Sequence, residues 1–238
     1  MRQSNAIVLL AALGLAALTA RLGVWQLDRA AQKLAIQAEV DSRRDLPALP
    51  AQVLATTLAQ AAGQHHRRIE LEGRWVGGLT LYLDNRPMNG RVGFVVLTPL
   101  ALPDGSAVLV QRGWLPRDQV DRTKIDAPPP PEGRVRVAGR IAPPPGRLYE
   151  FDAAASGAIR QNVDLSDLAR EMHLALRPLS IQQTADPGLP ADGLLRDWPV
   201  ASAGMHKNYG YAFQWFALSA LICGLYVWFR ILRPRRRA

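Results

Sequence analysis

The segment His206-Lys-Asn-Tyr-Gly-Tyr-Ala-Phe-Gln-Trp-Phe216 opens a long apolar run near the end of this 238-residue chain. The 21 residues from Tyr209 to Phe229 carry no charge, and five arginines follow between Arg230 and Arg237. At about 1.5 Å per residue, about 20 apolar residues cross the ~30 Å hydrocarbon layer, and Lys/Arg clusters stay on the cytoplasmic side. The sequence therefore predicts a transmembrane helix over 209–229 and a basic cytoplasmic tail over 230–238.

A second apolar run lies near the N-terminus. Residues 6–20 are uncharged, and apolar residues continue past Arg21 to Trp25. The basic start resembles a cleaved signal peptide, but Leu18 stands where cleavage favours a small residue. The alternative is an uncleaved anchor in which Arg21 reaches the interface. We favour the anchor, which predicts a transmembrane helix over 5–27 with a helical extension to about residue 40, and both termini in the cytoplasm.

The charge distribution argues against nucleic-acid binding, and the cysteine count excludes an internal disulfide and a thiolate metal site. The net charge is +9, but all 20 acidic residues lie between Asp28 and Asp197, whereas seven arginines lie outside that stretch. The excess therefore reflects membrane topology, and no basic stripe with interleaved aromatic residues indicates nucleic-acid binding. Cys223 is the only cysteine in the chain, so neither an internal disulfide nor a thiolate metal site can form.

Between the two apolar runs, residues 41–193 read as one extracytoplasmic α+β domain, and 194–208 as the linker that returns to the membrane. From Arg67 onward apolar residues alternate with polar ones, as in half-buried strands, and Asn89-Gly90 suits a tight hairpin. Ser166 is a candidate N-cap for a short helix. About seven short strands with two or three helices predict a mainly antiparallel sheet.

Side chains at the outer ends of the two apolar runs form the main candidate site. Gln214 lies inside the second span, where an unsatisfied amide is costly, so we expect it to face the other helix or a ligand. An ordinary aromatic belt is the alternative interpretation. An amphiphilic ligand also fits this setting, and haem fits physically, since its propionates need Arg or Lys and its iron needs imidazole. The residues concerned are Trp25, Gln26, Tyr209, Tyr211, Gln214 and Trp215, with His206 just beyond the helix end.

A third possible interpretation is that the central domain carries a catalytic site. No common nucleophile, P-loop, zinc-protease or dinucleotide-binding motif is present in the sequence. An enzyme would need a polar cleft among Asp84, Arg86, Arg112 and Asp118. We expect these four to be turn and salt-bridge residues.

Several short motifs together resemble the Surfeit locus protein 1 family of cytochrome c oxidase assembly factors. Each motif is weak alone, but their order and spacing within a two-helix frame are specific. They are Gly23-Val-Trp-Gln-Leu-Asp-Arg-Ala-Ala-Gln-Lys33, Asn85-Arg86, Gly93, Thr98-Pro99, Val110-Gln-Arg-Gly-Trp114, Gly139-Arg140 and Tyr211-Ala-Phe-Gln-Trp-Phe216.

The resemblance implies a membrane protein with two transmembrane helices flanking a periplasmic domain in the bacterial inner membrane. It implies a non-enzymatic assembly factor that aids haem a insertion into, or stabilises, subunit I of a haem-copper oxidase. Subunit I and membrane lipid are the implied partners, with haem a synthase as a further candidate. A scaffold that never binds haem is the alternative.

The resemblance also implies a histidine ligand for haem iron at the start of the second helix, which makes His206 the tentative metal ligand. The family places this histidine three residues before the Tyr of a Tyr-Ala pair. In this sequence the pair begins at Tyr211 and the position three residues before it is Asn208, so His206 departs from the family register. Gln32 is a second departure, since an aromatic residue is common there. The candidate haem a site comprises His206, Gln214, Trp25, Gln26, Tyr209, Trp215 and Arg29.

Overall fold

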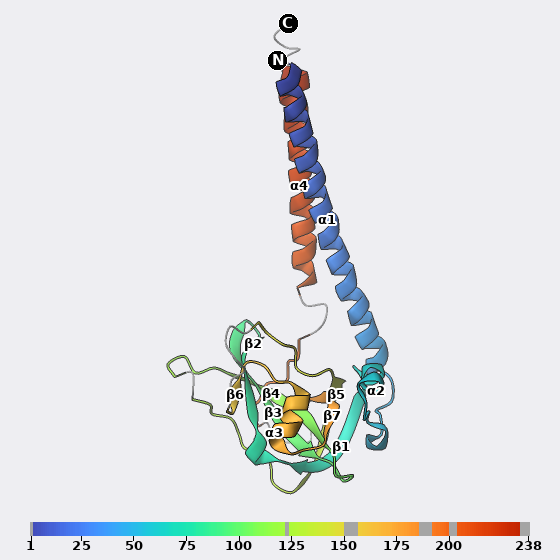
Figure 1. The fold of residues 1–238 in the computed structure, drawn as a ribbon, viewed down its shortest axis with the longest axis vertical. Coiled ribbons are helices and arrows are strands. Elements are labelled where there is room, and N and C mark those ends of the chain that lie inside the picture. The colour runs from blue at the N-terminus through green and yellow to red at the C-terminus, as the bar shows by residue number, and fades with distance from the viewer. Residues whose placement is uncertain (1, 122–123, 150–156, 186–191, 200–203, 234–238) are drawn as a thin grey trace. The chain divides into compact units, whose positions relative to one another are not determined.

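The computed structural model describes residues 2–121, 124–149, 157–185, 192–199 and 204–233. These residues form two compact units, one from Met1–Glu39 with Val200–Ala238 and the other from Val40–Pro199. The expected linker and basic tail lie partly outside the described residues. Figure 1 labels the helices and strands of both units.

The first unit is a pair of antiparallel helices, α1 (Arg2–Arg44) and α4 (Met205–Val227), with α4 continuing into a π-helical turn, η3 (Trp228–Leu232). Ser219 Oγ donates to the carbonyl of Ala16 at 2.9 Å, and Asn208 Nδ2 donates to Gln26 Oε1 at 2.8 Å. Within the described residues, both helices are long and apolar enough to cross a membrane. α4 is helical from Met205 onward, so the chain is not unwound at His206.

Small and polar residues form the seam between the two helices. Shielded positions on α1 recur at alternating spacings of four and three residues, and those on α4 follow the same rule. A repeat averaging 3.5 residues is the signature of left-handed coiled-coil packing. The residues of this repeat are Ala12, Ala16, Thr19, Gly23, Gln26, Ala30 and Lys33 on α1, where Ala20 and Leu22 beside it are also shielded, and Met205, Asn208, Ala212, Trp215, Ser219, Ile222 and Tyr226 on α4.

The second unit is built on a seven-stranded sheet whose order is β1-β5-β7-β4-β3-β2-β6. β1 also pairs with β3, so five strands close into a small barrel and β2 and β6 extend from it. The strands are β1 (Arg68–Trp75), β2 (Leu81–Met88), β3 (Arg91–Ala101), β4 (Ala107–Pro116), β5 (Arg134–Ala142), β6 (Ile159–Arg160) and β7 (Leu176–Gln183).

The sheet is mixed, which corrects the expectation of a mainly antiparallel sheet. β4 pairs with β7 in parallel, and β2 pairs with β6 in parallel. A parallel pair needs a long crossover, and the chain reaches β7 only after β5, β6 and the helix α3 (Leu165–Met172). Local alternation cannot reveal such an insertion. The expected hairpin at Asn89-Gly90 is confirmed, with φ of 50° and 76° in the turn between β2 and β3.

Two buried clusters hold the barrel together. Apolar side chains from all five closed strands meet inside, and Leu54, Ala55 and Ala61 join them from the segment that contains η1 (Ala51–Val53) and α2 (Leu58–Gln64). Outside, α3 packs Leu168 and Met172 against β2, β3 and β4. The short 3₁₀ turn η2 (Gly77–Leu79) links β1 to β2.

The N-cap of α3 is Asp164, which corrects the expectation of Ser166. The carboxylate of Asp164 accepts the backbone N–H groups of Ser166 and Asp167 at 2.8 and 3.2 Å. Either residue type can cap a helix, but only Asp164 stands where its side chain reaches the free amides of the first turn.

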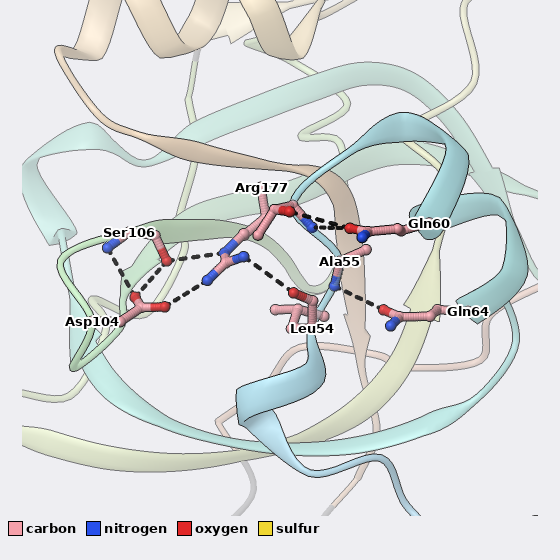
Figure 2. A network of polar contacts seen from close by, with 8 residues as sticks. Leu54, Ala55, Gln60, Gln64, Asp104, Ser106 and Arg177 are labelled. Carbon is pink, nitrogen blue, oxygen red and sulfur yellow. Dashed lines mark hydrogen bonds and ion pairs between the residues drawn. The ribbon is translucent and has the colours of Figure 1, made fainter.

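A polar network fastens the α2 segment to the turn between β3 and β4 (Figure 2). The Arg177 guanidinium on β7 donates to Leu54 O and pairs with the carboxylate of Asp104, which in turn accepts from Ser106. Gln64 on α2 accepts the backbone N–H of Ala55 at 2.9 Å. These contacts hold the segment before α2 across one end of the barrel.

Candidate functional site

A groove lies between α1 and α4 at the end of the helix pair where both apolar runs give way to charged residues. Its volume is about 470 Å³. The lining residues are Trp25, Gln26, Arg29, Gln32, Lys33 and Ile36 from α1, and Gly204, Lys207, Asn208 and Tyr211 from the start of α4.

Asn208 is the polar centre of the groove. Its carbonyl Oδ1 accepts a hydrogen bond from Lys33 Nζ at 2.8 Å, and its Nδ2 donates to Gln26 Oε1 at 2.8 Å. All three side chains are partly shielded in the helix seam. A polar contact placed in such a seam selects one register of the two helices, because sliding either helix would leave an amide or an ammonium unsatisfied.

Cationic and aromatic side chains surround this centre. Arg29 lies over the ring of Trp25 at 5.8 Å and donates to Gln32 Oε1 at 3.3 Å. Lys207 is exposed in the first turn of α4. No acidic residue is among the lining residues, so the groove carries three formal positive charges from Arg29, Lys33 and Lys207.

The residues predicted from sequence divide into two groups. Trp25, Gln26 and Arg29 line the groove together with Tyr211, and four others lie outside its lining. Of those four, His206 and Gln214 are exposed, and Tyr209 is 44 % exposed.

Trp215 also lies outside the groove lining, in the helix seam one residue past Gln214. Sequence reasoning missed Asn208 and Gly204 as lining residues, and it included Lys33 as part of the family motif. On α4, Asn208, Ala212 and Trp215 lie on one heptad face, and the helix register turns this face, which excludes Gln214, toward α1.

The groove fits part of a haem group. Arg29 and Lys207 are suited to propionates, and Trp25, Tyr211 and Ile36 are suited to the edge of a macrocycle. The lining contains no imidazole, thiol or thioether, which are common axial ligands of haem iron. Among the described residues, no group of three His, Cys, Asp or Glu side chains could hold a separate metal ion.

The four charged residues that a catalytic site in the central domain would need make separate structural contacts. Asp84 pairs with Arg117, and Arg86 donates to the carbonyls of Gly146 and Gln161, both at 2.7 Å. Asp118 accepts the backbone N–H groups of Val120 and Asp121 in a turn. Asp84 and Asp118 thus have the salt-bridge and turn roles that the sequence predicts, whereas Arg86 binds two backbone carbonyls.

Arg112, the fourth of these residues, is only 2 % exposed. It donates to Pro128 O at 3.2 Å and lies over the ring of Trp75 at 5.6 Å. Burial lowers the pKa of the Arg112 guanidinium, and the nearby Asp192 carboxylate opposes that shift. Arg112 therefore holds the loop at Pro128 against the barrel as a buried cation.

In the central domain, residues of the motifs that resemble the Surfeit locus protein 1 family form hydrogen bonds between strands. Gln111 Nε2 donates to Ser180 Oγ at 2.8 Å, and Arg140 donates to Gln182 Oε1 at 2.7 Å. Trp114 Nε1 donates to the carbonyl of Arg86 at 2.7 Å. The ring of Trp114 lies where a Cβ on Gly93 would be, so this position requires glycine. These residues build the barrel.

Comparison with known proteins gives one family. The SURF1 family matches residues 13–220 of this chain. The cytochrome oxidase assembly protein SHY1 of Saccharomyces cerevisiae is 25 % identical over 155 residues, which is 63 % of this chain but only 40 % of the yeast protein. A SURF1-like protein of Rickettsia felis is 23 % identical over 88 % of this chain and 90 % of its own length. A SURF1-like protein of Monosiga brevicollis is 26 % identical over 92 % of this chain and 86 % of its own length.

Proposed function

Because this chain belongs to the SURF1 family, we propose that it is a membrane-anchored, non-enzymatic assembly factor for a haem-copper (cytochrome c) oxidase. The match over residues 13–220 carries this proposal, since it includes the barrel and most of both apolar helices. The yeast relative, which is named as a cytochrome oxidase assembly protein, supports the same role.

The proposed location is the bacterial inner membrane, with both termini in the cytoplasm and the Val40–Pro199 unit in the periplasm. Two helices of sufficient length and apolarity support an anchor, and the arginines after Phe229 support a cytoplasmic C-terminus. Single cysteines at Gly105 and at Ala238, each in a Cys223→Ser background, test the topology. A membrane-impermeant maleimide applied to spheroplasts should label only the cysteine at position 105.

Oxidase subunit I is the proposed partner, and the helix pair would dock beside it while haem a is inserted. Deleting the gene should lower the haem a content and activity of the oxidase, and the wild-type gene should restore both. Affinity purification of the tagged protein should recover subunit I. Normal haem loading in the deletion strain would contradict the assembly role.

The finer proposal is that the groove holds haem a transiently. Arg29 and Lys207 would bind its propionates, and Trp25 and Tyr211 would pack on its edge. His206 lies outside the groove lining, so it would provide the iron ligand only by turning its imidazole into the groove. Optical spectra of protein purified in mild detergent from cells that make haem a test this proposal. Loss or shift of the haem bands in His206→Ala, but not in Tyr209→Phe, would support ligation by His206.

A second candidate function is a scaffold for oxidase assembly that does not carry haem, and the position of Asn208 favours it. The amide of Asn208 occupies the place in the family register where the resemblance implies an imidazole, and Lys33 and Gln26 hold it. In that case the wild-type protein is colourless and His206→Ala assembles oxidase normally. An Asn208→His variant would then gain haem bands, because it places an imidazole in the groove.

A further inference from the structure

We propose that the groove between α1 and α4 binds the phosphate headgroup of an anionic phospholipid. This inference concerns a lipid ligand and does not depend on haem carriage. It rests on the charge of the groove, its position along the two helices, and the geometry at the start of α4.

The charge of the groove favours an anion. Arg29, Lys33 and Lys207 come from two different helices and converge on one volume of about 470 Å³, with no acidic residue among the lining side chains. Lys33 donates to the Asn208 amide at 2.8 Å. Arg29 and Lys207 have no acidic neighbour among the lining residues, and an anion bound between them relieves their mutual repulsion.

The start of α4 adds to this field. Its N-cap is Gly204, with φ of 74° and no side-chain hydrogen bond to the first turn, and no acidic residue lies in that turn. No side chain of this turn or its cap therefore satisfies the positive end of the helix dipole or the free amides. Lys207 belongs to this same turn, so the dipole and the three cations act on one place.

The position of the groove favours a lipid phosphate over a small soluble anion. On α1 the lining residues follow the apolar run, and on α4 they precede it, so the groove lies at the boundary between hydrocarbon and water. Trp25 and Tyr211 are 47 % and 52 % exposed, and amphipathic aromatic side chains favour the headgroup level. These two rings provide apolar contacts for glycerol and the first acyl carbons, which inorganic phosphate lacks.

Native mass spectrometry in mild detergent tests the proposal, with protein purified from cells that make no haem a. The probes are phosphatidylglycerol, phosphatidylcholine and inorganic phosphate. We expect phosphatidylglycerol to bind about tenfold more tightly than phosphatidylcholine, because interfacial cations attract anionic lipid and the choline group cancels the phosphate charge. The double variant Arg29→Gln/Lys207→Gln should bring the two lipids to within about twofold of each other.

Two further variants control for folding and for general lipid contact. Arg29→Lys/Lys207→Arg keeps both charges and should keep the preference for phosphatidylglycerol. Arg21→Gln removes a cation of α1 that lies outside the groove lining, and it should also keep the preference. If wild type shows no preference, or if the double variant retains it, the proposal is wrong. If inorganic phosphate at the same concentration competes as well as phosphatidylglycerol for the groove, the ligand is free phosphate and the lipid assignment is wrong.

The lipid and haem proposals can fail separately. A preference for phosphatidylglycerol in colourless protein supports the lipid site and gives haem carriage no support. Haem bands that survive Arg29→Gln/Lys207→Gln, together with loss of lipid preference, would assign the cations to lipid alone.

Discussion

At the scale of single residues, Arg177 joins three distant parts of the chain. Its side chain is 12 % exposed and contacts Asp104, Ser106 and the carbonyl of Leu54. We expect Asp104→Asn to lower the free energy of unfolding by about 1–2 kcal/mol, since hydrogen bonds to charged groups contribute about that much. Urea unfolding followed by near-ultraviolet circular dichroism of the tryptophans measures the change. Glu70→Gln, which removes an exposed ion pair with Arg136, should change stability by less than about 0.5 kcal/mol.

The Asp104 contacts also predict a pH dependence. Hydrogen bonds from the Ser106 side chain and backbone, with a smaller contribution from Arg177, lower the pKa of Asp104. A carboxyl group with a lowered folded-state pKa stabilises the protein above its unfolded pKa of about 3.9, and this stabilisation is lost as pH falls through the folded value. The difference in stability between wild type and Asp104→Asn should therefore be largest at pH 7 and should shrink as the pH falls through the lowered pKa of Asp104. A difference that persists unchanged at low pH would contradict this origin.

At the scale of elements, α3 depends on its cap. Asp164→Ala removes the acceptor for two first-turn amides and should destabilise the protein by about 1 kcal/mol. Asp164→Ser provides another good capping residue and should recover most of the loss. Thermal unfolding of the three proteins measures both effects. Ser166→Ala, which removes the residue favoured by sequence, should have a smaller effect than Asp164→Ala.

The helix pair depends on the small residues of its seam. A Cβ on Gly23 would lie 2.8 Å from the Phe216 ring, so Gly23→Leu should push α4 away from α1. Disulfide formation between cysteines at Ala16 and Ser219, in a Cys223→Ser background, reports helix proximity, because these residues are in contact. We expect Gly23→Leu to lower the disulfide yield severalfold. Gly14→Leu is the matched control, since nothing lies within 4 Å of its Cβ position.

At the scale of the Val40–Pro199 unit, closure of the barrel depends on the junction where β1 meets β3. Arg74 pairs with Ala101 there, and a Cβ on the preceding Gly73 would lie 2.4 Å from the Ala101 carbonyl oxygen. Gly73→Ala should therefore cost about 1–3 kcal/mol of stability through overpacking. Gly78→Ala, at a position with nothing within 4 Å, should stay within about 0.5 kcal/mol of wild type. Equal stability of the two variants in urea would show that the barrel does not need this close approach.

Local signals in the sequence determined many elements of this protein. Charge-free runs indicate both apolar helices, period-two alternation indicates the strands, and Asn89-Gly90 indicates the hairpin, because each signal lies within one short segment. The interface position of the candidate site follows from the same runs, and three of the residues predicted there, Trp25, Gln26 and Arg29, line one groove.

Only the tertiary structure decided which side chains meet. It inserts β7 between β4 and β5 and so makes the sheet mixed, and it turns Asn208 toward Lys33 while Gln214 is exposed. These outcomes depend on strand order and helix register, which are set by contacts between segments far apart in the chain. A shift of two residues rotates a helical side chain by about 200°, so the proximity of His206 to Asn208 in sequence could not show which of them enters the groove.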